Sequence, residues 1–224
     1  GVAADLAESS HDEAARARND LLTPISKAFS TDIANEVASL GVQIHGGMGF
    51  IEETGAAQHA RDARILPIYE GTNGIQAMDL VGRKLPLGNG AVVKDYVGDM
   101  HETAEICRQS NHPVLVDIAG KLAEAINVLE DTTQWVLDQG HSLDVLAGAT
   151  PYLRLFALAA GGHYLARGAH AVVQTEMDPA FSQRKMATAQ FFAHNILSQC
   201  SGLAAAAMAG NDMLDDIGLD ALVS

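Results

Sequence analysis

One carboxylate, Glu70, stands between an apolar run and a glycine, a setting that could support proton abstraction. The run ends at Tyr69, and Gly71 follows Glu70 directly. Pro67 lacks a backbone donor and disfavours helical angles at the residue before it, so we expect an ordered loop here. A base that removes a weakly acidic proton needs surroundings that tune its basicity. We expect Glu70 to lie in apolar surroundings just ahead of a helix N-terminus, where burial and the helix dipole would tune its pKa. Glu70 is therefore the candidate catalytic base.

A helix is expected to begin directly after this loop. Thr72 or Asn73 can cap its first turn, because short polar side chains accept hydrogen bonds from free backbone N–H groups. An acidic residue near a helix start also stabilises the helix through its dipole, without any catalysis. From residue types alone, the catalytic and the structural interpretation of Glu70 both stay open.

Glycines cluster at 46–49, in the sequence GGMG, at the end of a predicted long helix. Backbone without side chains can approach another group closely. The cluster is not the dinucleotide fingerprint, which needs a strand before it and a helix opening within it. Its residue types indicate either a helix stop followed by a turn, or a surface that a ligand approaches closely.

Three segments in this order resemble the end of the catalytic unit of acyl-CoA dehydrogenases: QIHGGMGF at 43–50, RDA at 61–63 and IYEGTNGIQ at 68–76. That family uses FAD to desaturate acyl-CoA thioesters between the α and β carbons. The resemblance covers residues 1–85. GGMGFIEETGAAQ at 46–58 is most similar to the subgroup with the long-chain enzymes and 3-methylmercaptopropionyl-CoA dehydrogenase, and the helical remainder resembles that subgroup's C-terminal extension.

The resemblance implies a role for each of these positions. Glu70 would abstract the α-proton of the acyl-CoA substrate while a hydride leaves the β-carbon for the flavin. The Glu70 backbone N–H and a flavin ribityl hydroxyl would hold the thioester oxygen, and preorganised donors of this kind contribute strongly to catalysis. Tyr69 and Gly71 would contact the substrate. The implied FAD contacts are Gln43, Gly46, Gly47, Thr72, Asn73 and Gly74.

The same resemblance implies partners. Gln43, Gly46 and Gly47 would touch the FAD of a neighbouring subunit, so we expect a homo-oligomer, either a dimer or a tetramer. An electron-transfer flavoprotein-like acceptor would reoxidise the flavin. Many family members carry a longer polar side chain where Gly74 stands, so Asn73 would serve instead. The family's flavin-binding domain and first helices are not in this sequence, and we expect the chain alone to be inactive.

Composition restricts the class of protein further. The 224 residues are 48% hydrophobic and 5% aromatic, which favours packed helices over sheets. A formal net charge of −14 argues against binding to nucleic acid or to an anionic membrane. Two cysteines, Cys107 and Cys200, are too few for a disulfide framework and favour a reducing cytoplasm. We find no signal peptide and no apolar run long enough to span a bilayer.

The apolar pattern predicts an all-α fold, in which one antiparallel helix bundle is followed by a second. Thr23–Pro24 can start a long helix whose apolar stripe runs from Ile25 to Ile44. LPLGNG at 85–90 breaks the pattern, which separates a partial acyl-CoA dehydrogenase C-terminal helical domain, 1–85, from a helical extension, 91–224. The extension's expected helices are 91–109, 114–137, 142–147, 150–176 and 180–209, with an acidic tail at 212–224.

The extension carries no convincing catalytic set. His163 and His170 share a face of one predicted helix, but no acidic or Cys partner stands at ligand spacing beside them. We therefore predict core or surface histidines and no metal site. Gly161–Gly162 inside the same helix indicates close helix packing.

Three functions remain for the whole sequence. The motifs favour the C-terminal part of an FAD-dependent acyl-CoA dehydrogenase. A helical module for assembly or partner binding, without catalysis of its own, would also suit the apolar helices of the extension. An acyl-CoA oxidase of the same architecture, in which oxygen reoxidises the flavin, would carry the same residues.

Overall fold

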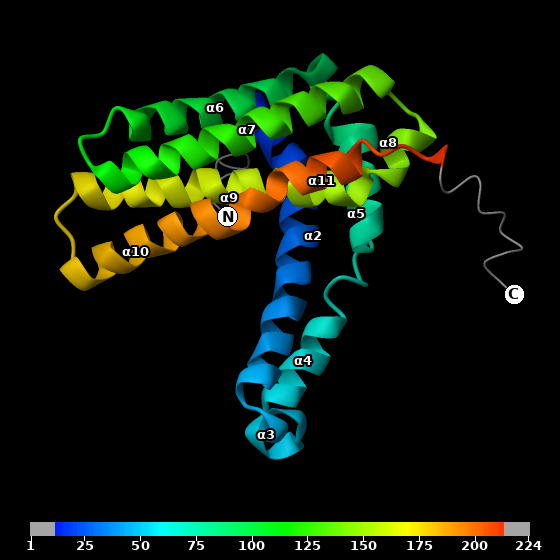
Figure 1. The fold of residues 1–224 in the computed structure, drawn as a ribbon. Coiled ribbons are helices and arrows are strands. Elements are labelled where there is room, and N and C mark those ends of the chain that lie inside the picture. Colours follow the sequence, from blue (N-terminus) through cyan, green and yellow to red (C-terminus); the bar gives the residue numbers. More distant parts are fainter. Residues whose placement is uncertain (1–11, 213–224) are drawn as a thin grey trace, which may run out of the picture.

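The computed structural model describes residues 12–212, which form helices and turns without a β-strand, as the all-α prediction requires. Figure 1 shows a bundle of long helices above a projecting arm, which consists of the second half of α2 with α3, η1 and α4. The long helices are α2 (Glu13–Ile44), α6 (Ala91–Arg108), α7 (Pro113–Gln139), α9 (Ala149–Gln174) and α10 (Pro179–Phe191).

Shorter elements connect the long helices. The short α-helices are α3 (Gly47–Phe50), α4 (Ala56–Arg64), α5 (Asn73–Asp79), α8 (Leu143–Ala147) and α11 (Cys200–Ala207). The 3₁₀ turns are η1 (Glu52–Thr54), η3 (Leu87–Gly90) and η5 (Leu197–Gln199), and the π-helical turns are η2 (Leu80–Lys84) and η4 (Phe192–Ile196). In the part of the chain that the structure describes, no helix has the length and apolar character of a membrane span.

The helix α2 is continuous through Thr23–Pro24, where the sequence predicts that a long helix starts. The Asp12 carboxylate accepts a hydrogen bond from the Ala14 backbone N–H at 2.9 Å and caps the helix at its N-terminal end. Pro24 lies buried inside the helix, and the Thr23 hydroxyl donates to the Asn19 carbonyl at 2.7 Å instead of capping. A proline removes one helical hydrogen bond, and packing of this part of α2 against the core offsets that loss. The predicted start at Thr23–Pro24 was therefore wrong.

The predicted single helix 180–209 is also wrong, because η4 and η5 interrupt it between α10 and α11. The interruption lies where two side chains meet the paired glycines of α9. A Cβ atom at Gly161 would lie 3.1 Å from Phe192 Cζ, and one at Gly162 would lie 3.0 Å from Leu197 Cδ1. These short approaches confirm that Gly161–Gly162 serves close helix packing, and they show that this packing accompanies the change of helix type.

The other extension helices follow the prediction closely. The helices α6, α7 and α8 each begin within one residue of the expected start. The helix α9 begins at Ala149 with Gly148 as its N-cap, so Thr150 is not the cap that the sequence suggested. The predicted acidic tail beyond residue 212 lies outside the described residues.

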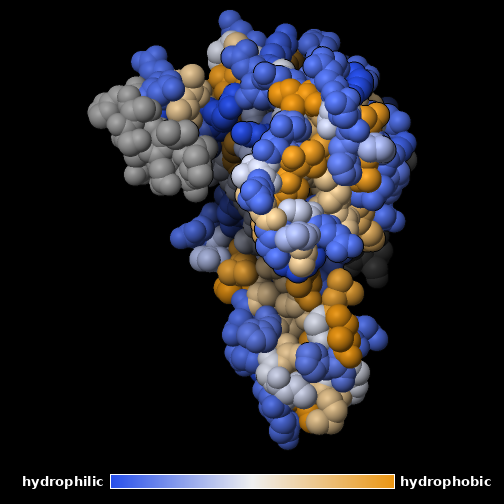
Figure 2. Space-filling model, turned by 90° about the vertical axis from the view of Figure 1, so that its left-hand side faces the viewer, coloured by the Kyte–Doolittle hydropathy of each residue, from blue (hydrophilic) through white to orange (hydrophobic). Residues whose placement is uncertain are grey.

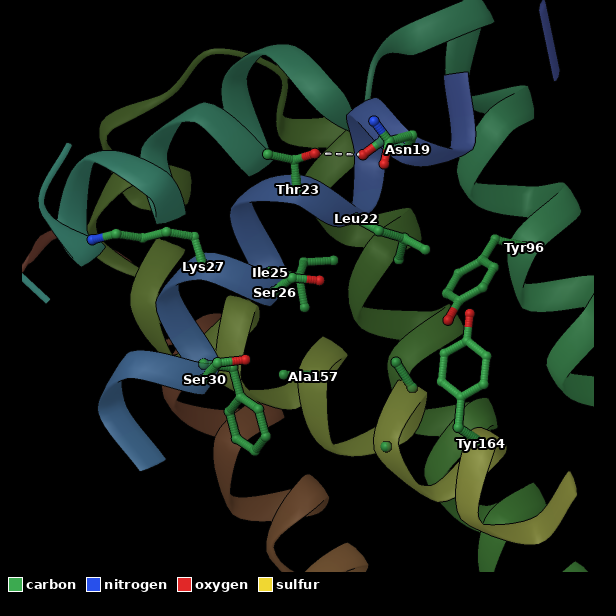
Figure 3. A pocket seen from close by; sticks show the side chains of 13 residues that line it. Asn19, Leu22, Thr23, Ile25, Ser26, Lys27, Ser30, Tyr96, Ala157 and Tyr164 are labelled. Carbon is green, nitrogen blue, oxygen red and sulfur yellow. Dashed lines mark hydrogen bonds between the residues drawn. The ribbon is translucent and has the colours of Figure 1, made fainter. Parts of the chain in front are cut away.

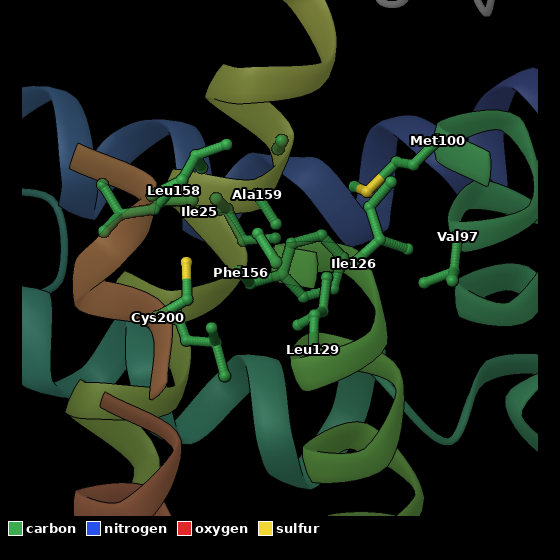
Figure 4. Close-up of a cluster of buried hydrophobic side chains, with 14 of the residues drawn as sticks. Ile25, Val97, Met100, Ile126, Leu129, Phe156, Leu158, Ala159 and Cys200 are labelled. Carbon is green, nitrogen blue, oxygen red and sulfur yellow. The ribbon is translucent and has the colours of Figure 1, made fainter. Parts of the chain in front are cut away.

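One hydrophobic core runs through both predicted domains. Ile25 of α2 is buried in the same cluster as Phe156 and Leu158 of α9 and Ile126 of α7. Figure 4 shows these side chains together with Cys200 from α11. Full burial of one such side chain contributes about 1.5–3 kcal/mol. Since α2 shares this core with the extension, the division into 1–85 and 91–224 stays a proposal about the sequence.

A buried histidine lies at the edge of this core. His163 is 2% exposed, and its ring meets that of Tyr96 edge-on with 6.0 Å between the ring centres. Burial, together with the nearby cations of Arg167 and Arg18, lowers the pKa of His163 from 6.5 to about 4, although Asp99 opposes the shift. His163 is thus a core histidine, and His170 on the same helix is half-buried.

We predict that His163→Leu makes stability less dependent on pH. Because the pKa of His163 is lowered in the folded chain, the unfolded chain binds a proton between pH 6.5 and about 4 that the folded chain does not bind. The free energy of unfolding therefore falls as the pH drops through this window. The loss is at most about tenfold in the folding equilibrium constant per pH unit. Denaturant unfolding at several pH values measures it. His59→Leu, at an exposed site, is the control, and equal slopes for His163→Leu and the original chain would contradict the prediction.

A second prediction concerns Gly148, the buried N-cap of α9. A Cβ atom there would collide with the Ala207 carbonyl of α11, and backbone cannot move aside as a side chain can. Gly148→Ala should therefore lower the free energy of unfolding by about 1–3 kcal/mol. Gly98→Ala, in the exposed middle of α6 where a Cβ atom meets open space, should raise it by about 0.5–1 kcal/mol. Similar values for the two variants would show that the α9–α11 contact is looser than described.

Candidate functional site

The predicted base lies on the loop 65–72, which joins α4 to α5. Backbone hydrogen bonds order this loop: the Tyr69 N–H donates to the Ile65 carbonyl at 3.2 Å, and the Asn73 N–H donates to the Pro67 carbonyl at 3.1 Å. Glu70 has a φ of 54°, in the left-handed region that non-glycine residues rarely occupy. The expected ordered loop is therefore confirmed, and its geometry holds Glu70 in a strained conformation.

The surroundings of Glu70 differ from the expectation. Its side chain is exposed, and so are the apolar side chains of Ile68, Tyr69 and Ile75 close to it in the chain. The prediction that Glu70 is embedded in apolar surroundings was wrong for this chain, because no element among residues 12–212 covers these side chains. Apolar side chains do flank the carboxylate, but they are exposed to solvent, as Glu70 is.

Gly71 and Gln76 complete the turn that carries Glu70. Gly71 has a φ of 82°, and a Cβ atom there would lie 2.9 Å from Gln76 Nε2. The same Gln76 nitrogen donates to the Glu70 carbonyl at 3.2 Å. Thr72 caps α5, since its hydroxyl oxygen accepts from the Ile75 N–H at 3.4 Å. The turn needs glycine at position 71 both for its backbone angles and for the space that Gln76 occupies.

The helix α2 holds this turn through polar contacts that the sequence did not reveal. Lys27 Nζ donates to the Gly71 carbonyl and to Asn73 Oδ1, each at 2.8 Å. Asn73 Nδ2 lies 2.9 Å from Thr31 Oγ1 and 2.7 Å from Asp32 Oδ1, both of α2, and 3.0 Å from the carbonyl oxygen of Ala28. The Asn73 side chain thus faces α2, and its contact with a cofactor stays a prediction. Polar residues at helical spacing on α2, namely 27, 31 and 32, were the available signal.

The second group of predicted site residues lies at the tip of the arm. Gln43 is exposed near the end of α2, and Gly46 and Gly47 form the passage into α3. Gly46 has φ 62° and ψ −148°, angles that glycine alone adopts readily. A Cβ atom at Gly49 would collide with the Val42 carbonyl, so this glycine serves packing within the tip.

The two groups lie apart within residues 12–212. Residues 69–74 share the loop and the start of α5, whereas the tip lies beyond α4, as Figure 1 shows. Polar contacts support the arm between them: Arg61 pairs with Glu52 at 2.7 Å, and Asn35 Nδ2 donates to the Ala63 carbonyl at 2.8 Å. Gly74 lies in the first turn of α5, where a Cβ atom would approach only Thr72 Oγ1, at 4.0 Å.

The arm exposes many apolar side chains. Ile44 is 83% exposed and Phe50 is 81% exposed, and both lie beside the glycines of the tip. Figure 2 shows hydrophobic surface on the arm beneath the bundle. Other exposed apolar residues of the arm are Val37, Leu40, Met48 and Ile51. A surface of this kind is typical of a part that contacts another chain or another segment.

A groove of about 760 Å³ lies between α2, α6 and α9. Asn19, Thr23 and Ser26 line it from α2, and Tyr96 and Tyr164 close one end, with their hydroxyl groups turned toward one another in Figure 3. None of the predicted site residues lines this groove.

Two family models match the chain, one over its first part and one over its helical remainder. The family described as "Acyl-CoA dehydrogenase, C-terminal domain" matches residues 3–85, and the one described as "Acetyl-CoA dehydrogenase C-terminal like" matches residues 96–217. The 3-methylmercaptopropionyl-CoA dehydrogenase of Ruegeria pomeroyi is 43% identical over 205 residues, which are 88% of this chain and 35% of the relative.

Two further relatives are more distant or shorter in their match. A butyryl-CoA dehydrogenase of Syntrophomonas wolfei is 26% identical over 80% of this chain and 30% of its own length. The caffeyl-CoA reductase–Etf complex subunit CarC of Acetobacterium woodii is 41% identical over 61 residues, 27% of this chain and 16% of the relative.

The chain belongs to the acyl-CoA dehydrogenase family, a family of oxidoreductases. Within that family it belongs to the subgroup with a helical C-terminal extension that includes 3-methylmercaptopropionyl-CoA dehydrogenase. The chain spans about a third of the length of the first two relatives, 35% and 30%.

We predict that Gly71→Ala destabilises the chain, whereas Gly74→Ala does not. An alanine at 71 must adopt a left-handed conformation and displace Gln76, at a cost of about 1–2 kcal/mol. An alanine at 74 lies within α5 with space for its Cβ atom and should be neutral or raise stability by about 0.4–1 kcal/mol. Denaturant unfolding of the two variants measures the difference. Equal stabilities would mean that the Glu70 turn relaxes freely and is not held as described.

Proposed function

We propose that the complete protein is an FAD-dependent acyl-CoA dehydrogenase in which Glu70 is the α-proton-abstracting base. One observation carries the proposal: in a chain of this family, Glu70 is the one carboxylate among residues 12–212 that is presented on an ordered left-handed turn, between Tyr69 and Gly71. The turn aims an exposed carboxylate outward from a rigid support, as a base that meets a separate substrate requires.

The residues of the turn have separate tasks in this mechanism. The Glu70 carboxylate accepts the α-proton of the thioester, and the Glu70 backbone N–H donates to the thioester oxygen as negative charge develops there. Gly71 has no side chain to obstruct the acyl group, and the Tyr69 ring lines its path. Bound FAD supplies the acceptor for the hydride that leaves the β-carbon.

The residues present suit the two ends of the cofactor. At the tip of the arm, Gln43 is exposed and a Cβ atom on Gly46 or Gly47 would meet open space, so backbone and amide groups are accessible to an ADP moiety. At the loop, the Thr72 hydroxyl is exposed beside the start of α5, and Asn73 and Gly74 follow it. Because tip and loop lie apart within one chain, we propose that each serves a different FAD in a homo-oligomer, a dimer or a tetramer.

The remaining parts of the proposal concern the complete protein. Its electron acceptor resembles an electron-transfer flavoprotein; one relative is itself named as part of an Etf complex. We propose a cytoplasmic enzyme, a substrate of the acyl-CoA class and no nucleic-acid partner, in keeping with the net charge of −14. The chain from 1 to 224, without the rest of the enzyme, should be inactive.

We predict that Glu70→Gln abolishes reduction of the flavin while leaving the flavin bound. The amide keeps the shape of the side chain but accepts no proton, so the rate should fall at least about 1000-fold. The complete protein, free of oxygen, is mixed with a panel of acyl-CoA thioesters while the flavin absorbance is recorded.

Glu102→Gln, at an exposed position of α6, serves as the control for the charge change. The control should react like the original protein with the same thioester. Full flavin reduction by the Glu70→Gln variant would refute the assignment of the base. A complete protein that takes up no flavin would refute the proposed function as a whole.

A further inference from the structure

Lys27 joins the middle of α2 to the turn that carries Glu70. Lys27 is one of the residues that line the groove between α2, α6 and α9, but its half-buried side chain extends away from the others, as Figure 3 shows. The amino group donates to the Gly71 carbonyl and to Asn73 Oδ1, each at 2.8 Å, across 44 and 46 positions of sequence. Hydrogen bonds from a charged donor are shorter and stronger than those between neutral groups. Lys27 therefore holds backbone and side chain on both sides of Thr72.

The two peptide groups that follow Glu70 are held by separate donors. Gln76 Nε2 donates to the Glu70 carbonyl at 3.2 Å, and Lys27 Nζ donates to the Gly71 carbonyl. Glu70 and Gly71 have left-handed φ angles, 54° and 82° respectively. Left-handed backbone at a non-glycine residue persists only where surrounding contacts enforce it. Because the Glu70 conformation is strained, the direction of its side chain and of its backbone N–H depends on these contacts.

The support behind Lys27 is rigid. Ile25 and Ala28, its neighbours on α2, are 4% and 1% exposed and belong to the hydrophobic core. The Asn73 side chain bridges back to the same helix, with Nδ2 2.9 Å from Thr31 Oγ1 and 2.7 Å from Asp32 Oδ1. A displacement of the turn would therefore break contacts to a helix that the core fixes in place.

We propose that Lys27 is a positioning residue for the catalytic step. Together with Asn73, to which it is hydrogen-bonded, it holds the Glu70 turn against α2, so that the carboxylate and the Glu70 N–H keep their orientation toward the thioester. This inference rests on the proposed function of Glu70. Lys27 touches neither substrate nor cofactor in this role. Its loss slows proton abstraction and leaves flavin and thioester binding largely intact.

The test uses Lys27→Met in the complete protein, because methionine keeps an apolar stem of similar length and removes the donor. A base displaced by about 1 Å can lose about 100-fold in rate, so flavin reduction at saturating thioester should slow by about 10- to 100-fold. The flavin content and the dissociation constant of the thioester should change less than about threefold. The kinetic isotope effect with an α-deuterated thioester should rise, because transfer of the α-proton then limits the reaction more strongly.

Three companion variants separate the possible outcomes. Lys27→Arg keeps a cationic donor and should recover at least part of the rate. Thr31→Val removes one polar neighbour of Asn73 at constant shape and should slow reduction less than Lys27→Met does; it also keeps the inference testable if Lys27→Met fails to fold. Lys185→Met, at an exposed position of α10, controls for the loss of a lysine and should behave like the original protein.

The results distinguish this inference from the proposed function. If Glu70→Gln is inactive while Lys27→Met reduces its flavin at the original rate, the positioning role is refuted and the base assignment stands. If Glu70→Gln is fully active, the proposed function fails independently of Lys27. A Lys27→Met variant whose slower reduction comes with proportional loss of flavin and an unchanged isotope effect would show a purely structural role, which also overturns the inference.

Discussion

The anchoring of α2 in the hydrophobic core is the constraint on which the rest of the structure depends. Leu21, Ile25 and Ala28 are buried on one side of this helix, among residues from α7, α9 and α11. The other side of the same helical turns carries the polar contacts to the Glu70 loop, and its far half supports the arm with the glycine-rich tip. Because one rigid helix connects all three parts, packing in the extension is linked mechanically to the candidate site. This gives the extension a role in support of the loop that carries Glu70.

The Glu70 turn shows how a strained conformation is maintained at a candidate site. Left-handed backbone at a glutamate costs about 1–2 kcal/mol, and a glycine next to it makes the chain more flexible in the unfolded state. Hydrogen bonds from Gln76 and Lys27 to two successive carbonyls compensate for these costs locally. In a chain with a net charge of −14, Lys27 directs its cation at a backbone carbonyl and an amide oxygen of the turn.

The arm has the opposite character to the bundle. It exposes large apolar side chains such as Ile44 and Phe50, while the bundle buries most of its own. The matched segments make up 35% and 30% of the first two relatives, which are therefore much longer than this chain. Glu70 is exposed because the described residues contact its loop on one side only, through α2, and leave the other side open.

The sequence by itself determined the features that depend on neighbouring residues. It predicted the all-α class, the loop at Pro67, a cap at Thr72 or Asn73, the close packing at Gly161–Gly162 and most of the extension helices. These features depend on proline geometry, capping and apolar periodicity, which act within one or two helical turns. The tertiary structure decided what depends on distant residues. Packing against the core keeps α2 helical on both sides of Pro24. The predicted last helix is interrupted where its Phe192 and Leu197 pack against the paired glycines of α9. The exposure of Glu70 and its support by Lys27, which reaches Gly71 across 44 positions, also required the fold, because no local rule relates side chains so far apart in the chain.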